Sequence, residues 1–246
     1  GLNTIGGALS LQTKSGFSSP RFEASRTQGA WGRRQNQLAI GANNGVVAGF
    51  VAANEFREDG WRDHSPSSVN QYFGRLDVRG DGFEITGSLL RVSNDLTGNG
   101  LVPYEDYAVR PEAVFTSPDT SRNDLHHYTL RGRLDVSGTD SVSAMVYRRR
   151  LTQRSVGGDI WDDFDRLSYG RLDDCPFSNF PYVSANGAYD QEGPTSPGCP
   201  GFPPTGLFNI GGTQQQAKGV TLQWTRVSEA LARRGAAVVG HARARP

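Results

Sequence analysis

The chain has no long apolar run. None of its segments approaches the roughly 18 consecutive apolar residues that a membrane-spanning helix requires. Apolar residues make up only 36% of its 246 residues, and its mean hydropathy is -0.52. These values argue against a helical membrane protein. They leave room for a membrane β-barrel, because only alternate residues of each strand face lipid while the loops are polar.

The chain also has little net charge and lacks the residue patterns of an enzyme. A formal charge of +1 gives no support to nucleic-acid binding. No Ser/His/Asp or Cys/His arrangement and no phosphate-binding glycine loop occurs, so we expect neither an enzyme nor a cofactor. His126 and His127 would face opposite sides of one strand and could not chelate together. An acidic loop lacks the residue order of a calcium site, so we interpret it as solvated and expect no bound metal. Its carboxylates are Asp162, Asp163, Asp165, Asp173 and Asp174.

Cysteine is scarce as well. The two cysteines, Cys175 and Cys199, lie in one stretch rich in Gly, Pro and Asn. Their spacing fits no zinc signature, since there is no CxxC and no His nearby. In an oxidising compartment they would close and constrain one loop, so we predict a disulfide between them. Two unpaired thiols are the alternative.

Short segments that alternate apolar with polar residues recur along the chain. Within Gln71–Arg79, Leu76 and Val78 alternate with Arg75 and Asp77. Successive side chains of a strand point to opposite faces, so this pattern predicts a strand with one apolar and one charged face. Eight such strands are predicted. They are about Arg21–Thr27, Asn36–Ala42, Val46–Phe56, Gln71–Arg79, Phe83–Leu89, His126–Val136, Ser141–Leu151 and Gly219–Val227.

The connections between these strands are alternately short and long. Tight turns (NNG, GDG and SGTD) alternate with long connections at Asp59–Val69, Asn94–Asp124 and Thr152–Ala217. Outer-membrane barrels have short periplasmic turns and long outer loops. The pattern therefore predicts an all-β fold, an antiparallel up-and-down meander that forms part of a transmembrane β-barrel. We expect the apolar face to meet lipid and the charged face, with Arg75, Arg131 and Arg133, to line a wet lumen.

Three segments resemble those of TonB-dependent outer-membrane receptors of the siderophore or iron-chelate type. Gly6–Lys14 (GGALSLQTK) resembles the end of the family's plug domain, where a Gly-Gly pair precedes a short strand, predicted here from Ala8 to Thr13. Phe56–Arg62 resembles the end of an early barrel strand, and the segment SNDLTGNGLVPYED resembles a family loop. The resemblance spans most of residues 1–227. It implies a receptor in the outer membrane of a Gram-negative cell that imports a scarce nutrient, such as an iron–siderophore complex. It also implies an inner-membrane TonB-type energy transducer as a partner.

The chain is shorter than such a receptor. Barrels with a plugged lumen have roughly 22 strands, whereas about eight are predicted here. We therefore expect a fragment that does not transport alone and lacks both the export signal and the segment that contacts the energy transducer. Residues 1–16 are interpreted as the end of the plug and 17–227 as the N-terminal part of the barrel. Residues 228–246 form an irregular tail rich in Ala and Arg.

Two groups of residues are candidates for the functional site. Aromatic residues of the longest loop could stack on a planar chelate, or they could form the small core of that loop. Arg75, Arg131 and Arg133 could contact the plug or guide an anionic ligand, or simply be solvated in the lumen. Two other functions remain open: a binding-only surface receptor or adhesin, and a soluble β-sandwich or propeller that binds carbohydrate. The aromatic candidates are Trp161, Phe164, Tyr169 and Tyr182.

Overall fold

The computed structural model describes residues 12–19, 21–100, 102, 104–160, 182–183, 189–190 and 206–227. Strands dominate this part of the chain, and its one helix, α1 (Tyr104–Val109), has six residues. No helix among the described residues is long and apolar enough to cross a membrane. The strands are β1 (Phe22–Gln28), β2 (Arg34–Asn43), β3 (Val47–Glu58), β4 (Ser67–Gly80), β5 (Phe83–Thr97), β6 (Thr120–Asp135), β7 (Asp140–Ile160), β8 (Tyr182–Val183), β9 (Tyr189–Asp190) and β10 (Gly206–Arg226).

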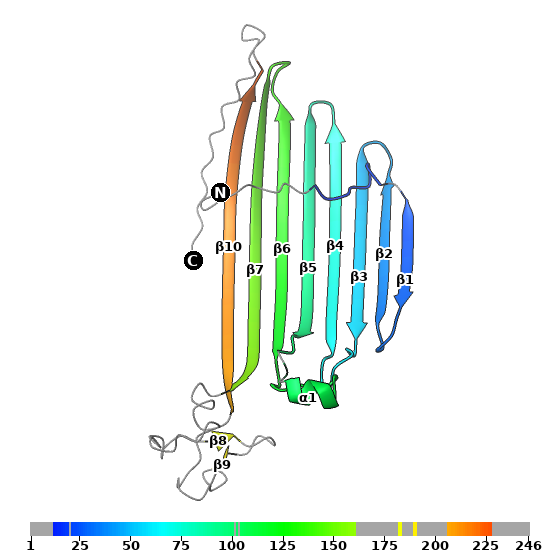
Figure 1. Ribbon diagram of the computed structural model, residues 1–246. Coiled ribbons are helices and arrows are strands. Elements are labelled where there is room, and N and C mark those ends of the chain that lie inside the picture. The colour runs from blue at the N-terminus through cyan, green and yellow to red at the C-terminus, as the bar shows by residue number, and fades with distance from the viewer. Residues whose placement is uncertain are drawn as a thin grey trace, which may run out of the picture.

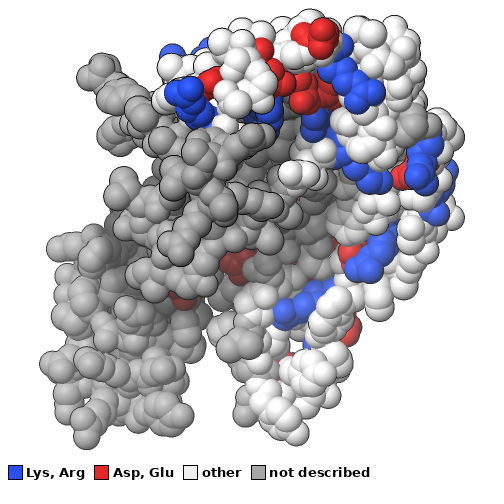
Figure 2. Space-filling model, turned by 90° about the horizontal axis from the view of Figure 1, so that it is seen from above, with Lys and Arg blue, Asp and Glu red and all other residues white. Residues whose placement is uncertain are grey.

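Eight strands form one antiparallel sheet in the order β1-β2-β3-β4-β5-β6-β7-β10, and β8 pairs with β9 separately. Neighbours in this order lie side by side in the sheet (Figure 1). The strands lengthen from 7 residues in β1 to 21 in β7 and β10. Seen from the end with the tight turns, the described strands follow an arc (Figure 2). The sheet is not closed, since β1 and β10 are its two edges. The predicted all-β meander, a partial β-barrel, is confirmed.

All eight predicted strands are present, but several are longer than predicted. The long connections are therefore shorter: 98–119 instead of Asn94–Asp124, and 161–205 instead of Thr152–Ala217. The largest difference is between β7 and β10, where the pairing continues to Ile160 and Gly206. Residues 211–216 of β10 read GGTQQQ, so they lack the alternation of apolar and polar residues. A continuous ladder to β7 still satisfies their backbone groups, and this pairing makes them strand.

The two faces of the sheet differ in the way the alternation predicts. Leu76, Leu130 and Val220 share one face, and each is about half exposed. On the other face Asp77 is only 1% exposed. Among the described residues the buried apolar side chains are Ala48 and Phe50, both of β3, and no second sheet covers the apolar face.

The N-terminal segment, residues 12–19, lies across the charged face of the sheet (Figure 1). Asn43 donates its side-chain amide to the Gly16 carbonyl at 2.8 Å. A Cβ at Gly16 would come within 2.4 Å of the carbonyl oxygens of Ala42 and Gly49, so only glycine fits this close approach. The sequence predicts a strand from Ala8 to Thr13, and this is wrong for residues 12–13, which belong to no strand. Residues 8–11 lie outside the described part of the chain.

Candidate functional site

Arg75 of β4 joins the wall of the sheet to the N-terminal segment. Its Nε and Nη2 donate to the Asp77 carboxylate at 2.7–2.9 Å. Its Nη1 donates to both the backbone carbonyl and the hydroxyl of Thr13, at 3.1 and 3.0 Å. Asp77 also accepts a hydrogen bond from Thr86 of β5 at 2.7 Å. The buried carboxylate is thus paired and hydrogen-bonded, as a charge removed from water must be.

A second arginine on the same face of β4 holds the next part of the segment. The guanidinium of Arg79 lies 3.7 Å from the ring centroid of Phe17, a cation–π contact. Its Nε donates to the Gly45 carbonyl at 3.0 Å, in the tight turn between β2 and β3. Ser15 and Ser19, on either side of Phe17, are each only 8% exposed. The segment is therefore fixed to the sheet by cationic side chains and by direct contact with the backbone.

A polar cavity of about 750 Å³ lies between the N-terminal segment and the sheet. Arg75, Arg131 and Arg133 all line it, so the structure brings the three predicted arginines to one space. Arg133 pairs with Asp135 at 3.0 Å, whereas Arg131 makes no ion pair with another described residue. The cavity is lined on the other side by Thr13, Ser15 and other residues of the segment. Its lining carries three arginines and one carboxylate, that of Glu84.

The other sequence candidates are not placed. Trp161, Phe164, Tyr169 and both cysteines lie outside the described residues. Tyr182 belongs to β8, opposite Asp190 of β9, and only its backbone position is described. The predicted aromatic cluster and the predicted disulfide therefore stay predictions.

Four members of the site were not predicted from the sequence: Asp77 as the partner of Arg75, and Thr13, Phe17 and Thr86. The i, i+2 spacing of Arg75 and Asp77 was a usable signal, because it places the two side chains on one face of a strand. The role of Phe17 had no signal in the sequence. It depends on where the N-terminal segment meets the sheet.

Among the described residues, no three His, Cys, Asp or Glu side chains are grouped to hold a metal ion. The chemistry available at the site is hydrogen bonding, ion pairing and cation–π contact. Such an arrangement holds a polypeptide segment against the sheet through polar and cation–π contacts.

Comparison with known proteins identifies the fold but no family. No family model matches the chain, and no curated protein matches it either. Among solved structures, it is similar to the closed form of the ferric-catecholate import receptor Fiu from Escherichia coli K12, with a TM-score of 0.52 and 12% sequence identity. The match covers 83% of this chain and 28% of the Fiu chain. An identity this low shows the fold alone: the sheet is similar to part of a receptor β-barrel. That neighbour is a transport receptor and not an enzyme.

Proposed function

We propose that this chain is part of a TonB-dependent outer-membrane receptor that imports a scarce nutrient, an iron–siderophore complex. The observation that carries the proposal is the N-terminal segment, which lies against the charged face of the meander and is held there by Arg75 and Arg79. In this proposal residues 12–16 of the segment are the end of the plug domain, inside the barrel, and residues 17–19 lead into the barrel wall. The likeness in fold to a ferric-catecholate import receptor supports it.

The two faces of the sheet support a membrane location. Apolar side chains such as Leu76, Leu130 and Leu222 are more than half exposed and have no layer packed on them among the described residues. Burying such surface is worth about 25 cal/mol per Å² of apolar area, and lipid supplies that burial. A β-sandwich would cover this face with a second sheet. The opposite face carries several arginines around a polar cavity, as the polar interior of an outer-membrane barrel does.

Each part then has a role within the proposal. The barrel wall is 17–227, in the outer membrane of a Gram-negative cell, with 1–16 as plug end and 228–246 as a tail. Arg131 and Arg133 guide an anionic chelate through the lumen. Aromatic side chains of the long loop stack on that chelate, and a disulfide between Cys175 and Cys199 constrains the loop. An inner-membrane TonB-type partner drives transport by acting on the plug.

Uptake of radiolabelled ferric catecholate by iron-starved cells tests the proposal. Deleting the gene that contains this chain should abolish uptake, and expressing the complete gene should restore it. Binding of the chelate to intact cells is measured in parallel. Binding without uptake would indicate a binding-only receptor or adhesin. Recovery of the protein in plain buffer, without detergent, would contradict the membrane location.

A further inference from the structure

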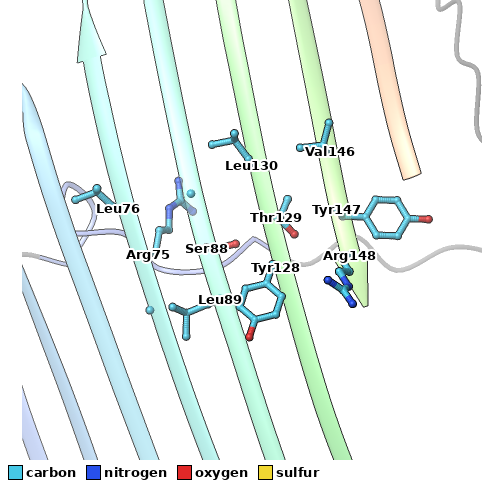
Figure 3. A pocket seen from close by; sticks show the side chains of 12 residues that line it. Arg75, Leu76, Ser88, Leu89, Tyr128, Thr129, Leu130, Val146, Tyr147 and Arg148 are labelled. Carbon is cyan, nitrogen blue, oxygen red and sulfur yellow. The ribbon is translucent and has the colours of Figure 1, made fainter. Parts of the chain in front are cut away.

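The apolar face carries a shallow groove of about 630 Å³ across β4, β5, β6 and β7. Leu76, Leu130 and Val146 lie in one row across the strands, with Leu89 in the next row (Figure 3). The depression results from two glycines, Gly74 and Gly87, that pair with leucines of the neighbouring strands. A Cβ at Gly87 would meet nothing within 4 Å, so the space above it is open.

Basic side chains gather at one end of this groove. Arg148 lines it and lies beside Tyr128 (Figure 3), and its partner across the β7–β10 ladder is Lys218. Arg150 and Arg91 occupy the next row on the same face, on either side of His126. We call Arg91, Arg148, Arg150 and Lys218 the basic cluster. All four are exposed, and none makes an ion pair with another described residue. Three acids near the cluster have other partners: Asp124 pairs with His126, Asp95 pairs with Arg122, and Glu55 accepts a hydrogen bond from Tyr72.

The basic cluster marks one edge of an apolar band. Along β5, the outward side chains are Phe83, Ile85, Gly87 and Leu89, followed by Arg91. The stretch from Phe83 to Leu89 has seven residues and spans about 20 Å at the usual rise per residue of a strand. The lipid-facing band of an outer-membrane barrel is about 25 Å tall. Relative to the apolar band, the cluster lies toward the long connections, where phospholipid or glycolipid headgroups would begin.

We infer that the groove and the basic cluster bind one anionic lipid with a phosphomonoester headgroup. An acyl chain lies along the groove over Gly87, and Arg148, Arg150 and Lys218 bind the phosphate. The charges are complementary: four cations without acidic partners face the plane of the headgroups. Arginine and lysine both form strong charge-assisted hydrogen bonds with phosphate oxygens. The inference rests on the membrane location in the proposed function, but not on import of a chelate.

Three probes separate the headgroup from the chain. Dioleoylphosphatidic acid has both parts, dioleoylglycerol has the same chains without phosphate, and glycerol 3-phosphate has the phosphate without chains. Each is titrated into the protein purified from outer membranes in a zwitterionic detergent, and bound lipid is counted by native mass spectrometry. We expect phosphatidic acid to bind well above the other two. Equal binding of dioleoylglycerol would overturn the role of the cluster, and equal binding of glycerol 3-phosphate would overturn the role of the groove.

Matched variants test each half of the site. Combining Arg148→Gln with Arg150→Gln should weaken phosphatidic acid binding about tenfold or more, the loss of hydrogen bonds to a charged group. Arg131→Gln with Arg133→Gln removes the same charge from the opposite face and should leave binding unchanged. Equal loss in both pairs would mean that only net charge matters, and would refute the site.

The groove is tested by Gly87→Leu, which fills it, against Gly132→Leu on the same face of β6. A Cβ at either glycine meets nothing within 4 Å. Only Gly87→Leu should lower the binding of phosphatidic acid. If the larger side chain reduces folded yield, Gly87→Ala replaces it in the test. Unchanged binding in both Gly87 variants would overturn the groove. Chelate uptake is measured in the strain with the unchanged protein, so failed uptake with intact lipid binding refutes import and leaves the lipid site standing.

Discussion

Arg75 and Asp77 lie two positions apart on β4 and form an ion pair that is nearly closed to water. The Asp77 side chain is 1% exposed and that of Arg75 is 19% exposed, with 2.7 Å between Nη2 and the nearer carboxylate oxygen. Arg133 and Asp135 repeat this spacing on β6, but their side chains are 58% and 45% exposed. The covering N-terminal segment makes the difference, since Thr13 contacts Arg75 directly.

We expect Asp77→Asn to lower the free energy of unfolding by about 3 kcal/mol, because it leaves a largely buried guanidinium without its counter-charge. Asp135→Asn is the matched control and should cost less than about 1 kcal/mol, as exposed ion pairs do. The measurement is unfolding in urea of the protein folded in detergent micelles. Similar losses in both variants would show that the segment does not shield Arg75 from water.

Arg75→Leu should loosen the N-terminal segment from the sheet. It removes two hydrogen bonds between the guanidinium and Thr13, each worth about 1.5–3 kcal/mol at a charged donor. Trypsin can cut after Lys14, and we expect that cut to become at least about tenfold faster. Arg131→Leu, in the same cavity but without a hydrogen bond to the segment, should not change the rate. Mass spectrometry identifies the fragment that ends at Lys14.

Gly16→Ala should destabilise the protein, since its Cβ would overlap backbone atoms of Ala42 and Gly49 that cannot rotate away. Overpacking of this kind costs about 1–3 kcal/mol. Gly132→Ala, where the added Cβ meets nothing within 4 Å, should be neutral or slightly stabilising. Urea unfolding again gives both values. A neutral Gly16→Ala would mean that the segment does not lie against the β2–β3 hairpin.

The strands could be predicted because side-chain alternation is a local property. Leu76 and Arg75 had to face opposite sides whatever their partners, and so the common face of Arg75, Arg131 and Arg133 was predictable. The outer parts of β7 and β10 were missed because GGTQQQ is polar on both faces and is fixed only by its ladder. Helix α1 was missed because six residues carry too little periodicity.

Contacts between residues far apart in the chain could not be predicted from the sequence. Arg75 and Thr13 are 62 positions apart, and nothing in either segment specifies the other. The basic cluster likewise depends on the register, which places Arg148 opposite Lys218 and Arg150 opposite His126. The sequence shows these as scattered charges on separate strands.

Two adjacent residues of β6 test which face of the sheet meets lipid. Leu130→Arg puts a charge in the middle of the apolar band, which costs about 2–4 kcal/mol at a lipid-facing position. Arg131→Leu changes the neighbouring residue on the opposite face, where it makes no ion pair with a described residue, and should cost little. Folded yield in outer membranes should fall sharply for the first variant alone. Equal damage from both would indicate a dry interior behind Arg131, as in a soluble sandwich.

The last prediction concerns orientation across the membrane. The tight turns, residues 44–46, 81–82 and 136–139, all lie at one end of the sheet (Figure 1). The connections 59–66 and 98–119 lie at the other end, where β7 also ends and β10 begins. In the proposed receptor the plug enters the barrel from the periplasm. Outer-membrane barrels have their short turns on that side. We therefore expect the long connections outside the cell. An epitope tag after Gly187 should bind antibody on intact cells, and a tag after Gly138 should bind only after the outer membrane is permeabilised. The reverse result would invert the orientation, and equal labelling of both on intact cells would contradict insertion in the membrane.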